Sequence, residues 1–174
     1  FADGFEMIRN CDLDMVDICV PTPWHKDYII AALEAGKHVF CEKPLCRDLE
    51  QMEEIVAAVK KSDRFFNVGL CIRAWPEYRH AYEMYKSGKL GELKCASFRR
   101  ISPTTDGGGS WKNWFTLFEL CGGALLDMHM HDADAVRYFF GKPKAVTAFG
   151  GKGLRSDSSV DHVFARYDYG DGKL

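Results

Sequence analysis

Short apolar runs alternate with longer amphipathic segments in the first part of the chain. Apolar runs at residues 16–20, 37–41 and 64–70 predict buried strands, and the segments between them, 22–36 and 48–62, have the apolar spacing of helices. A strand, a helix and a second strand this close in sequence form a right-handed parallel unit. Two such units in succession predict half of a doubly wound sheet, whose ligands are expected beyond the carboxyl ends of the strands.

Both helices of this first part carry boundary signals. Thr22 is expected to cap the first helix, with Pro23 in the first helical position, and Gly36 ends it. Asp48 is expected to cap the second helix, with Gln51 three residues later as in a capping box.

The pattern changes after residue 76. A helix is expected at 77–87, a strand with partial alternation at 93–101, and two further strands at 145–150 and 159–167. Only turns separate the last two, so they are expected to pair antiparallel. The predicted fold class is α/β, with part of a doubly wound parallel sheet followed by a largely antiparallel sheet.

The segment from Gly122 to Phe140 combines the apolar pattern of a buried helix with two histidines and three carboxylates. Asp127 and His131 stand four residues apart, so on a helix their side chains share one face. A carboxylate one turn away can orient the imidazole and stabilise its charged form, as a proton acceptor near neutral pH requires. His129 points elsewhere on a helix and is interpreted as structural or pocket-lining.

A metal site is the competing interpretation of this segment, because its histidines and aspartates are borderline ligands. His129 and His131 would share a face only on a strand, whereas the glycine pair before the segment and the long apolar pattern favour a helix. No metal is therefore assigned.

Lys43 is the second candidate for chemistry. It follows a predicted strand and precedes Pro44, which holds its ammonium group at the ligand edge of the sheet. A solvated turn lysine is the alternative. The glycine-rich stretches at 107–109 and 150–153 lack the strand-to-helix setting of a phosphate-binding loop and are interpreted as turns. Trp111 either stacks on a planar ring or packs in the interior.

Composition narrows the class of protein. A net charge of −2 provides no basic stripe for nucleic acid, and no apolar run approaches the length that spans a membrane. The seven cysteines lack any CxxC pair and are interpreted as reduced thiols of a cytoplasmic protein. The chain starts at Phe1, and the turn at Asp171-Gly172 has no return strand, so we expect a fragment that is inactive by itself.

Three motifs together resemble the Gfo/Idh/MocA oxidoreductases, the family of glucose-fructose oxidoreductase and inositol dehydrogenase. The motifs are Val20-Pro21-Thr22-Pro23 with His25, then Glu42-Lys43-Pro44 about 20 residues later, and finally Gly122-Gly123 leading through Asp127 to His131. The likeness covers nearly the whole chain. Two departures are Trp24, where asparagine is common in the family, and the absence of the glycine fingerprint that precedes this segment.

The resemblance implies an organisation and a set of ligands. Residues 1–73 would be the C-terminal half of an NAD(P)-binding Rossmann domain, and residues 74–174 the N-terminal part of a substrate and oligomerisation domain. The cofactor would be NAD or NADP, the substrate a sugar or polyol, and the full-length protein a homo-oligomer. The residues implied at the cofactor are Pro21, Thr22, Pro23, His25, Glu42, Lys43, Arg73 and Trp111.

The implied reaction is the oxidation of a secondary alcohol by the nicotinamide cofactor, which accepts the hydride, with Lys43, Asp127 and His131 as the catalytic residues. His131 would take the hydroxyl proton, Asp127 would hold the ring or the hydroxyl, and Lys43 would polarise the oxygen. Two alternatives stay open: an NAD-dependent glycoside hydrolase on the same fold, and a homologue that binds nucleotide or acts as a scaffold without turnover.

The edges of the two expected half-sheets give a first prediction. Because both lack neighbouring strands, we expect the isolated 174-residue chain to unfold without a cooperative transition. Thermal unfolding followed by far-ultraviolet circular dichroism tests this, and a single sharp melt would contradict it.

Overall fold

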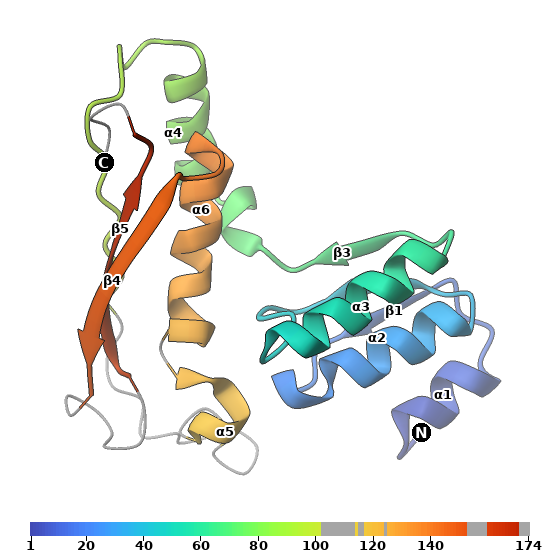
Figure 1. Cartoon of the computed structure of the whole chain (residues 1–174). Coiled ribbons are helices and arrows are strands. Elements are labelled where there is room, and N and C mark those ends of the chain that lie inside the picture. Colours follow the sequence, from blue (N-terminus) through green and yellow to red (C-terminus); the bar gives the residue numbers. More distant parts are fainter. Residues whose placement is uncertain (102–113, 115–116, 124, 153–159, 171–174) are drawn as a thin grey trace. The chain divides into compact units, whose positions relative to one another are not determined.

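The structure is a computed structural model that describes residues 1–101, 114, 117–123, 125–152 and 160–170 (Figure 1). The chain divides into two compact units, each described by itself below. The first unit comprises Phe1–Gly69 with Glu119–Cys121, and the second Leu70–Phe118 with Gly122–Leu174.

The first unit is built on a parallel sheet of three strands in the order β1-β2-β3. The strands are β1 (Met15–Ile18), β2 (His38–Cys41) and β3 (Phe66–Val68). Ile18 pairs with Cys41, which in turn pairs with Val68, so the three strands end level with one another. The parallel strand–helix–strand units predicted from the sequence are confirmed.

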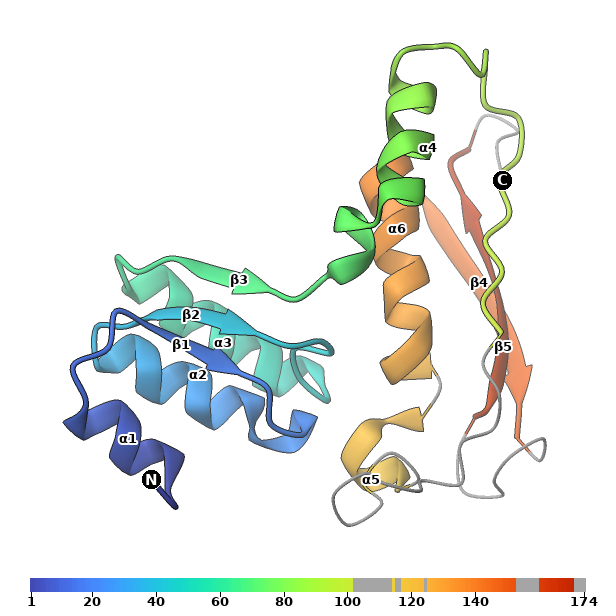
Figure 2. The same cartoon turned by 180° about the vertical axis from the view of Figure 1, so that it is seen from behind.

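Helices α2 (His25–Glu34) and α3 (Leu49–Lys61) cover the same face of this sheet, and α1 (Gly4–Asn10) packs beside α2 (Figures 1 and 2). Burial, together with the charge of Glu42, raises the pKa of the Cys41 thiol to about 12, so this thiol stays protonated and packs as a small apolar group. The buried core includes Ile8, Val16, Ile18, Ile29, Leu33, Val39 and Ile55.

The start of α2 differs from the prediction. A short 3₁₀ turn, η1 (Thr22–Trp24), precedes the helix, and the Trp24 amide donates to the Pro21 carbonyl at 3.1 Å. The Thr22 side chain is 1% exposed and makes no capping hydrogen bond, so its expected role as a cap is wrong. Residues 22–24 form a 3₁₀ turn, in which hydrogen bonds join residues three apart. The α-helical pattern, in which they join residues four apart, therefore starts only at His25.

The start of α3 follows the prediction. The Asp48 carboxylate accepts a hydrogen bond from the Gln51 amide at 2.9 Å. The Gln51 side chain reaches back to accept from the Arg47 amide at 3.0 Å, so the capping box is confirmed with its return bond one residue earlier than usual.

The second unit packs two helices against each other next to an antiparallel pair of strands. Helix α4 (Pro76–Lys86) contacts α6 (Met130–Phe140) through the stacked rings of Tyr82 and Tyr138, whose centroids lie 4.3 Å apart. Strands β4 (Ala145–Gly151) and β5 (His162–Asp168) pair antiparallel, as predicted. The other short elements of this unit are η2 (Cys71–Ala74) and the π-helical turn η4 (Leu125–His129), whereas the last three residues of the short helix α5 (Phe118–Cys121) belong to the first unit. None of the described helices is long and apolar enough to span a membrane.

The strand expected at 93–101 does not form. The segment pairs with no strand in the described part of the chain, although burial alternates from half-buried Ala96 to exposed Ser97 and half-buried Phe98. Alternation predicts which side chains face inward, but a strand also needs a neighbour to complete its hydrogen bonds.

Capping of α3 yields a stability prediction. Asp48→Ala in the full-length protein should lower the free energy of unfolding by about 1 kcal/mol, because it removes the acceptor for the Gln51 amide. Glu50→Ala is the matched control, since Glu50 is exposed in the first turn but does not cap. Urea denaturation measures both, and equal values for the two variants would contradict the prediction.

Candidate functional site

The carboxyl ends of the three parallel strands bring the predicted motifs of the first unit to one edge. The Glu42 amide donates to the Ile18 carbonyl at 2.9 Å, and the Gly69 amide donates to the Cys41 carbonyl at 2.8 Å. These bonds extend the ladder one residue beyond each strand. The loops that begin at residues 19, 42 and 69 therefore leave the sheet side by side, where a parallel sheet binds its ligands.

Glu42 occupies the space between two of these loops. Its Oε2 accepts a hydrogen bond from the Lys43 amide at 3.1 Å. Its Oε1 covers Gly69, where an added Cβ would lie only 3.1 Å away. The lack of a side chain at Gly69 thus leaves room for the carboxylate. The carboxylate in turn fixes the peptide group that joins Glu42 to Lys43, because it accepts from the N–H of that group.

His25 joins the loop after β1 to the loop after β2. Its ring is 1% exposed, with Nδ1 lying 2.9 Å from the Pro44 carbonyl oxygen and Nε2 lying 2.7 Å from the Val20 carbonyl oxygen. The sequence-based prediction placed His25 against the cofactor. Both ring nitrogens instead contact main-chain carbonyls, which leaves neither for a direct hydrogen bond to a ligand.

Thr22 provides a test of whether a ligand fits this edge. Its hydroxyl oxygen is buried and has no hydrogen-bond partner among the described residues. Buried hydroxyls are normally bonded, so an orphaned one beside the strand ends is consistent with a polar ligand that completes it. Pro21 and Pro23 flank Thr22 in the η1 turn, and Lys43 is half-buried in the next loop. These residues suit the nicotinamide dinucleotide that the sequence motifs imply.

In the second unit, the glycine pair reverses the chain before the predicted catalytic segment. Gly122 and Gly123 have φ values of 73° and 71°, which favour glycine. An added Cβ on Gly122 would also lie 2.5 Å from Cδ2 of Leu126 and 2.8 Å from its Cβ. Position 122 therefore requires glycine on two independent grounds.

The helix after the glycines starts with the π-helical turn η4, which the sequence analysis did not predict. Asp127 lies in this turn, and His131, which is 8% exposed, lies in the first turn of α6. The two residues are thus in successive turns, as their spacing predicted. Single π-helical turns occur often at functional sites.

Two arginines hold the other carboxylates of the segment. Arg100 forms two hydrogen bonds with Asp132, at 3.1 and 3.0 Å, and their side chains are 21% and 12% exposed. Arg73 binds Asp134 in the same bidentate way, at 2.8 and 2.5 Å. Of the three carboxylates in the segment, two therefore anchor α6 to η2 and to the segment 93–101.

Arg73 thereby has a structural partner in addition to its predicted place near the cofactor. Its guanidinium lies 5.1 Å from the ring centre of Tyr138, and hydrogen bonding to Asp134 raises its pKa. The Arg73 side chain is still 45% exposed. Arg100 was missed by the sequence analysis, although its inward position in the alternating segment 93–101 was a usable signal.

His129 connects the π-helical turn to β5. Its Nε2 lies 2.9 Å from the hydroxyl of Tyr167. Burial, followed by the charge of Asp132, raises the pKa of that phenol. His129 therefore has a structural contact, in line with its interpretation from the sequence, and Tyr167 is a second residue that the sequence analysis missed.

Two further points from the sequence concern Trp111 and a metal site. Trp111, predicted near the cofactor or substrate, lies outside the described residues. Within the described residues, no group of three or more histidine, cysteine, aspartate or glutamate side chains could hold a metal ion.

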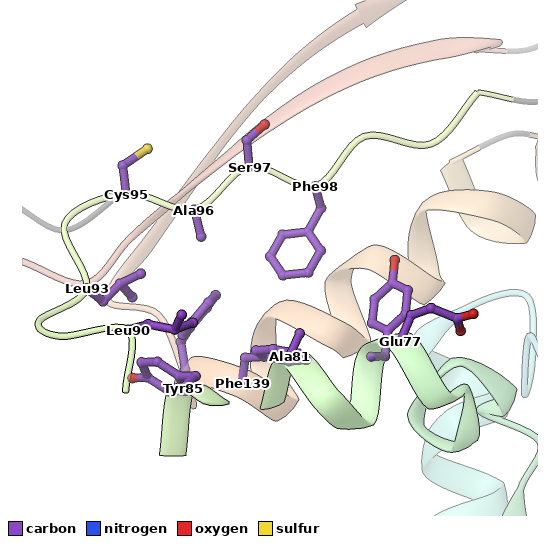
Figure 3. Close-up of a pocket in the computed structure, with 12 residues that line it drawn as sticks. Glu77, Ala81, Tyr85, Leu90, Leu93, Cys95, Ala96, Ser97, Phe98 and Phe139 are labelled. Atoms are coloured by element: carbon purple, nitrogen blue, oxygen red, sulfur yellow. The ribbon is translucent and has the colours of Figure 1, made fainter. Parts of the chain in front are cut away.

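The second unit also contains an apolar cavity of about 370 Å³ between α4, α6 and the segment 90–98 (Figure 3). The ring of Phe98 points into it, whereas Cys95 and Ser97 point away (Figure 3). None of Lys43, Asp127 and His131 lines this cavity.

Comparison with known protein families matches both parts of the chain. Residues 1–70 match the GFO/IDH/MocA model described as an oxidoreductase family with an NAD-binding Rossmann fold. Residues 78–174 match the model of the GFO/IDH/MocA C-terminal domain. The NAD-binding class expected from the motifs is confirmed by the first match.

Individual relatives agree with this match. Myo-inositol 2-dehydrogenase of Thermotoga maritima is 30% identical over 82% of this chain and 40% of its own length. The 2,7-anhydro-N-acetylneuraminate hydratase of Escherichia coli is 29% identical over 93% of this chain and 44% of its own. The crystal structure of myo-inositol 2-dehydrogenase from Lactobacillus plantarum superimposes with a TM-score of 0.86 at 28% identity, over 99% of this chain and 52% of that one. The chain spans less than half the length of these two curated relatives.

The Gly122 turn gives a prediction with a built-in control. Gly122→Ala should lower the free energy of unfolding by about 2–5 kcal/mol, the sum of left-handed backbone strain and the clash with Leu126. Gly36→Ala should lose only about 1–2 kcal/mol, because Gly36 also has a positive φ but an added Cβ would meet nothing within 4 Å. Urea denaturation of the full-length variants measures the difference, and equal losses would contradict the role of Leu126.

Proposed function

This chain belongs to the GFO/IDH/MocA family of oxidoreductases, and we propose that its protein transfers a hydride from a secondary alcohol of a sugar, cyclitol or related polyol to NAD or NADP. In this proposal residues 1–73 form part of the cofactor domain and residues 74–174 part of the substrate domain. One observation at the edge of the parallel sheet carries the proposal. The loops that follow adjacent strands hold Glu42, Lys43 and Thr22, and the buried Thr22 hydroxyl has no hydrogen-bond partner among the described residues.

The cofactor would lie along the loops at this edge. Thr22 would hydrogen-bond it through its buried hydroxyl, with Pro21 and Pro23 shaping the turn, while Glu42 and Lys43 border it from the next loop. Arg73 and Trp111 complete the proposed set. When bound, the nicotinamide ring supplies the carbon that accepts the hydride.

The chain's own residues handle the proton and the oxygen of the substrate. Lys43 donates a hydrogen bond to the hydroxyl oxygen and stabilises the negative charge that develops on it. As the C–H bond breaks and its electron pair leaves with the hydrogen, an imidazole nitrogen of His131 takes the hydroxyl proton. Asp127, one turn earlier, orients the imidazole or the substrate hydroxyl. General acid–base catalysis of this kind contributes about 10²–10⁴-fold in rate.

The names of the relatives support a polyol substrate. Two of the three proteins compared are named inositol dehydrogenases, which act on a ring of secondary alcohols. The relative named as a hydratase favours one second candidate, a reaction on a sugar without net oxidation, such as cleavage of a glycoside through transient oxidation. A homo-oligomeric full-length protein remains part of the proposal.

Substitution of the three proposed residues tests the mechanism. Lys43→Ala, Asp127→Ala and His131→Ala in the full-length protein should each lower kcat/KM for polyol oxidation by about 10²-fold or more, as expected when an acid–base group is lost. Lys60→Ala is the control, because Lys60 is exposed at the end of α3. Formation of NADH or NADPH with a panel of polyols gives the rates, and unchanged turnover in all three variants would disprove the assignment.

Two binding and turnover measurements separate the alternatives. Fluorescence titration with NADH distinguishes a nucleotide-binding protein from one that binds no cofactor. Release of nitrophenol from nitrophenyl glycosides, without net NADH formation, would favour the glycoside hydrolase. Cofactor binding without turnover of any alcohol or glycoside would favour the scaffold.

A further inference from the structure

We propose that His25 is a positioning residue for Lys43: it fixes the main chain beside the lysine and does not bind the cofactor. The inference rests on the proposed function of Lys43, but its structural part concerns only the first unit. It follows from where the two ring nitrogens lie and from what they contact.

The His25 ring spans the loops that follow two adjacent strands. Nε2 contacts the carbonyl of Val20, which follows β1, and Nδ1 contacts the carbonyl of Pro44, which follows Lys43 in the loop after β2. His25 is 1% exposed, so solvent does not reach the contacts between its ring and the two carbonyl oxygens. His25 is also the first residue of α2, which packs on the sheet and fixes the origin of the side chain.

Both partners of His25 are acceptors, which makes the ring a donor. A main-chain carbonyl accepts hydrogen bonds and cannot donate them. A neutral imidazole has one N–H, so it can donate to only one of the two carbonyls, and the protonated ring can donate to both. In either state the buried ring is the donor group between the two loops.

Lys43 is therefore held at the main chain on both sides. Its amide donates to the Glu42 carboxylate at 3.1 Å, and the carbonyl of the next residue, Pro44, faces His25 at 2.9 Å. Lysine has a flexible stem of four carbons, so the precision of its ammonium group depends on where the main chain starts it. A displacement of about 1 Å at a reacting group can lower a rate by about 10²-fold.

Two substitutions separate the contacts of the two ring nitrogens. The amide nitrogen of an asparagine can stand near the position of Nδ1, and that of a glutamine near the position of Nε2. His25→Asn therefore keeps a donor for Pro44 and loses the one for Val20, whereas His25→Gln does the reverse. His38→Gln is the matched control, because the His38 ring accepts from the Phe65 amide at 2.9 Å at the opposite end of β2.

Kinetics of the full-length protein provide the first readout. His25→Gln should lower kcat for polyol oxidation by about 10- to 100-fold, as expected for a misplaced reacting group, and leave the Kd for NADH near the wild-type value. His25→Asn should retain most of the wild-type kcat, and so should His38→Gln. If both His25 variants weaken NADH binding alike, His25 is a direct cofactor contact and the inference is wrong.

Hydrogen exchange of the full-length protein provides a second readout that needs no activity. Deuterium uptake in a peptide covering residues 42–47 should rise in His25→Gln and stay near the wild-type level in His25→Asn and His38→Gln. Equal uptake in all variants, or equal loss of thermal stability with unchanged kcat, would reduce His25 to a core residue and overturn the inference. A protein that oxidises no polyol but shows the exchange difference would overturn the proposed function and support the positioning of the loop.

Discussion

The level ending of the three parallel strands is the constraint on which the first unit depends. Hydrogen bonds from Glu42 to Ile18 and from Gly69 to Cys41 carry the ladder past the last paired residues, so three loops must leave the sheet at one edge. Because these hydrogen bonds hold the peptide groups at the strand ends, the loops begin from fixed positions. His25 then ties the loop after β1 to the loop after β2, and the Glu42 carboxylate binds the Lys43 amide within the loop after β2.

In the second unit, ion pairs hold helix α6 in place. A helix that carries several carboxylates into a packed interior needs a cation for each one that it does not use for chemistry. Arg100 and Arg73 provide these cations for Asp132 and Asp134 through bidentate contacts that also fix direction. The proposed pair Asp127 and His131 thus belongs to a helix whose neighbouring charges are already neutralised.

The positions of the elements could be predicted more closely than their hydrogen bonding. The Asp48 cap with Gln51 is a local signal, and it was confirmed because both partners lie within one turn. Thr22 carried the same kind of signal but sits in a 3₁₀ turn instead. The segment 93–101 has the predicted alternation of burial without the strand, because alternation is local and strand pairing is not.

The sequence by itself determined the succession of the three parallel strands and their helices, the antiparallel pairing of the last two strands and the motifs at residues 20–25, 42–44 and 122–131. These depend on periodicity, turn residues and spacing along the chain. Only the tertiary structure decided that His25 lies between two main-chain carbonyls, that Glu42 covers Gly69 and that Arg100 pairs with Asp132. The physical reason is that a side chain's partner is set by what lies across the fold from it. Partners such as Arg100 and Asp132 are 32 residues apart in sequence and meet only once the chain has packed.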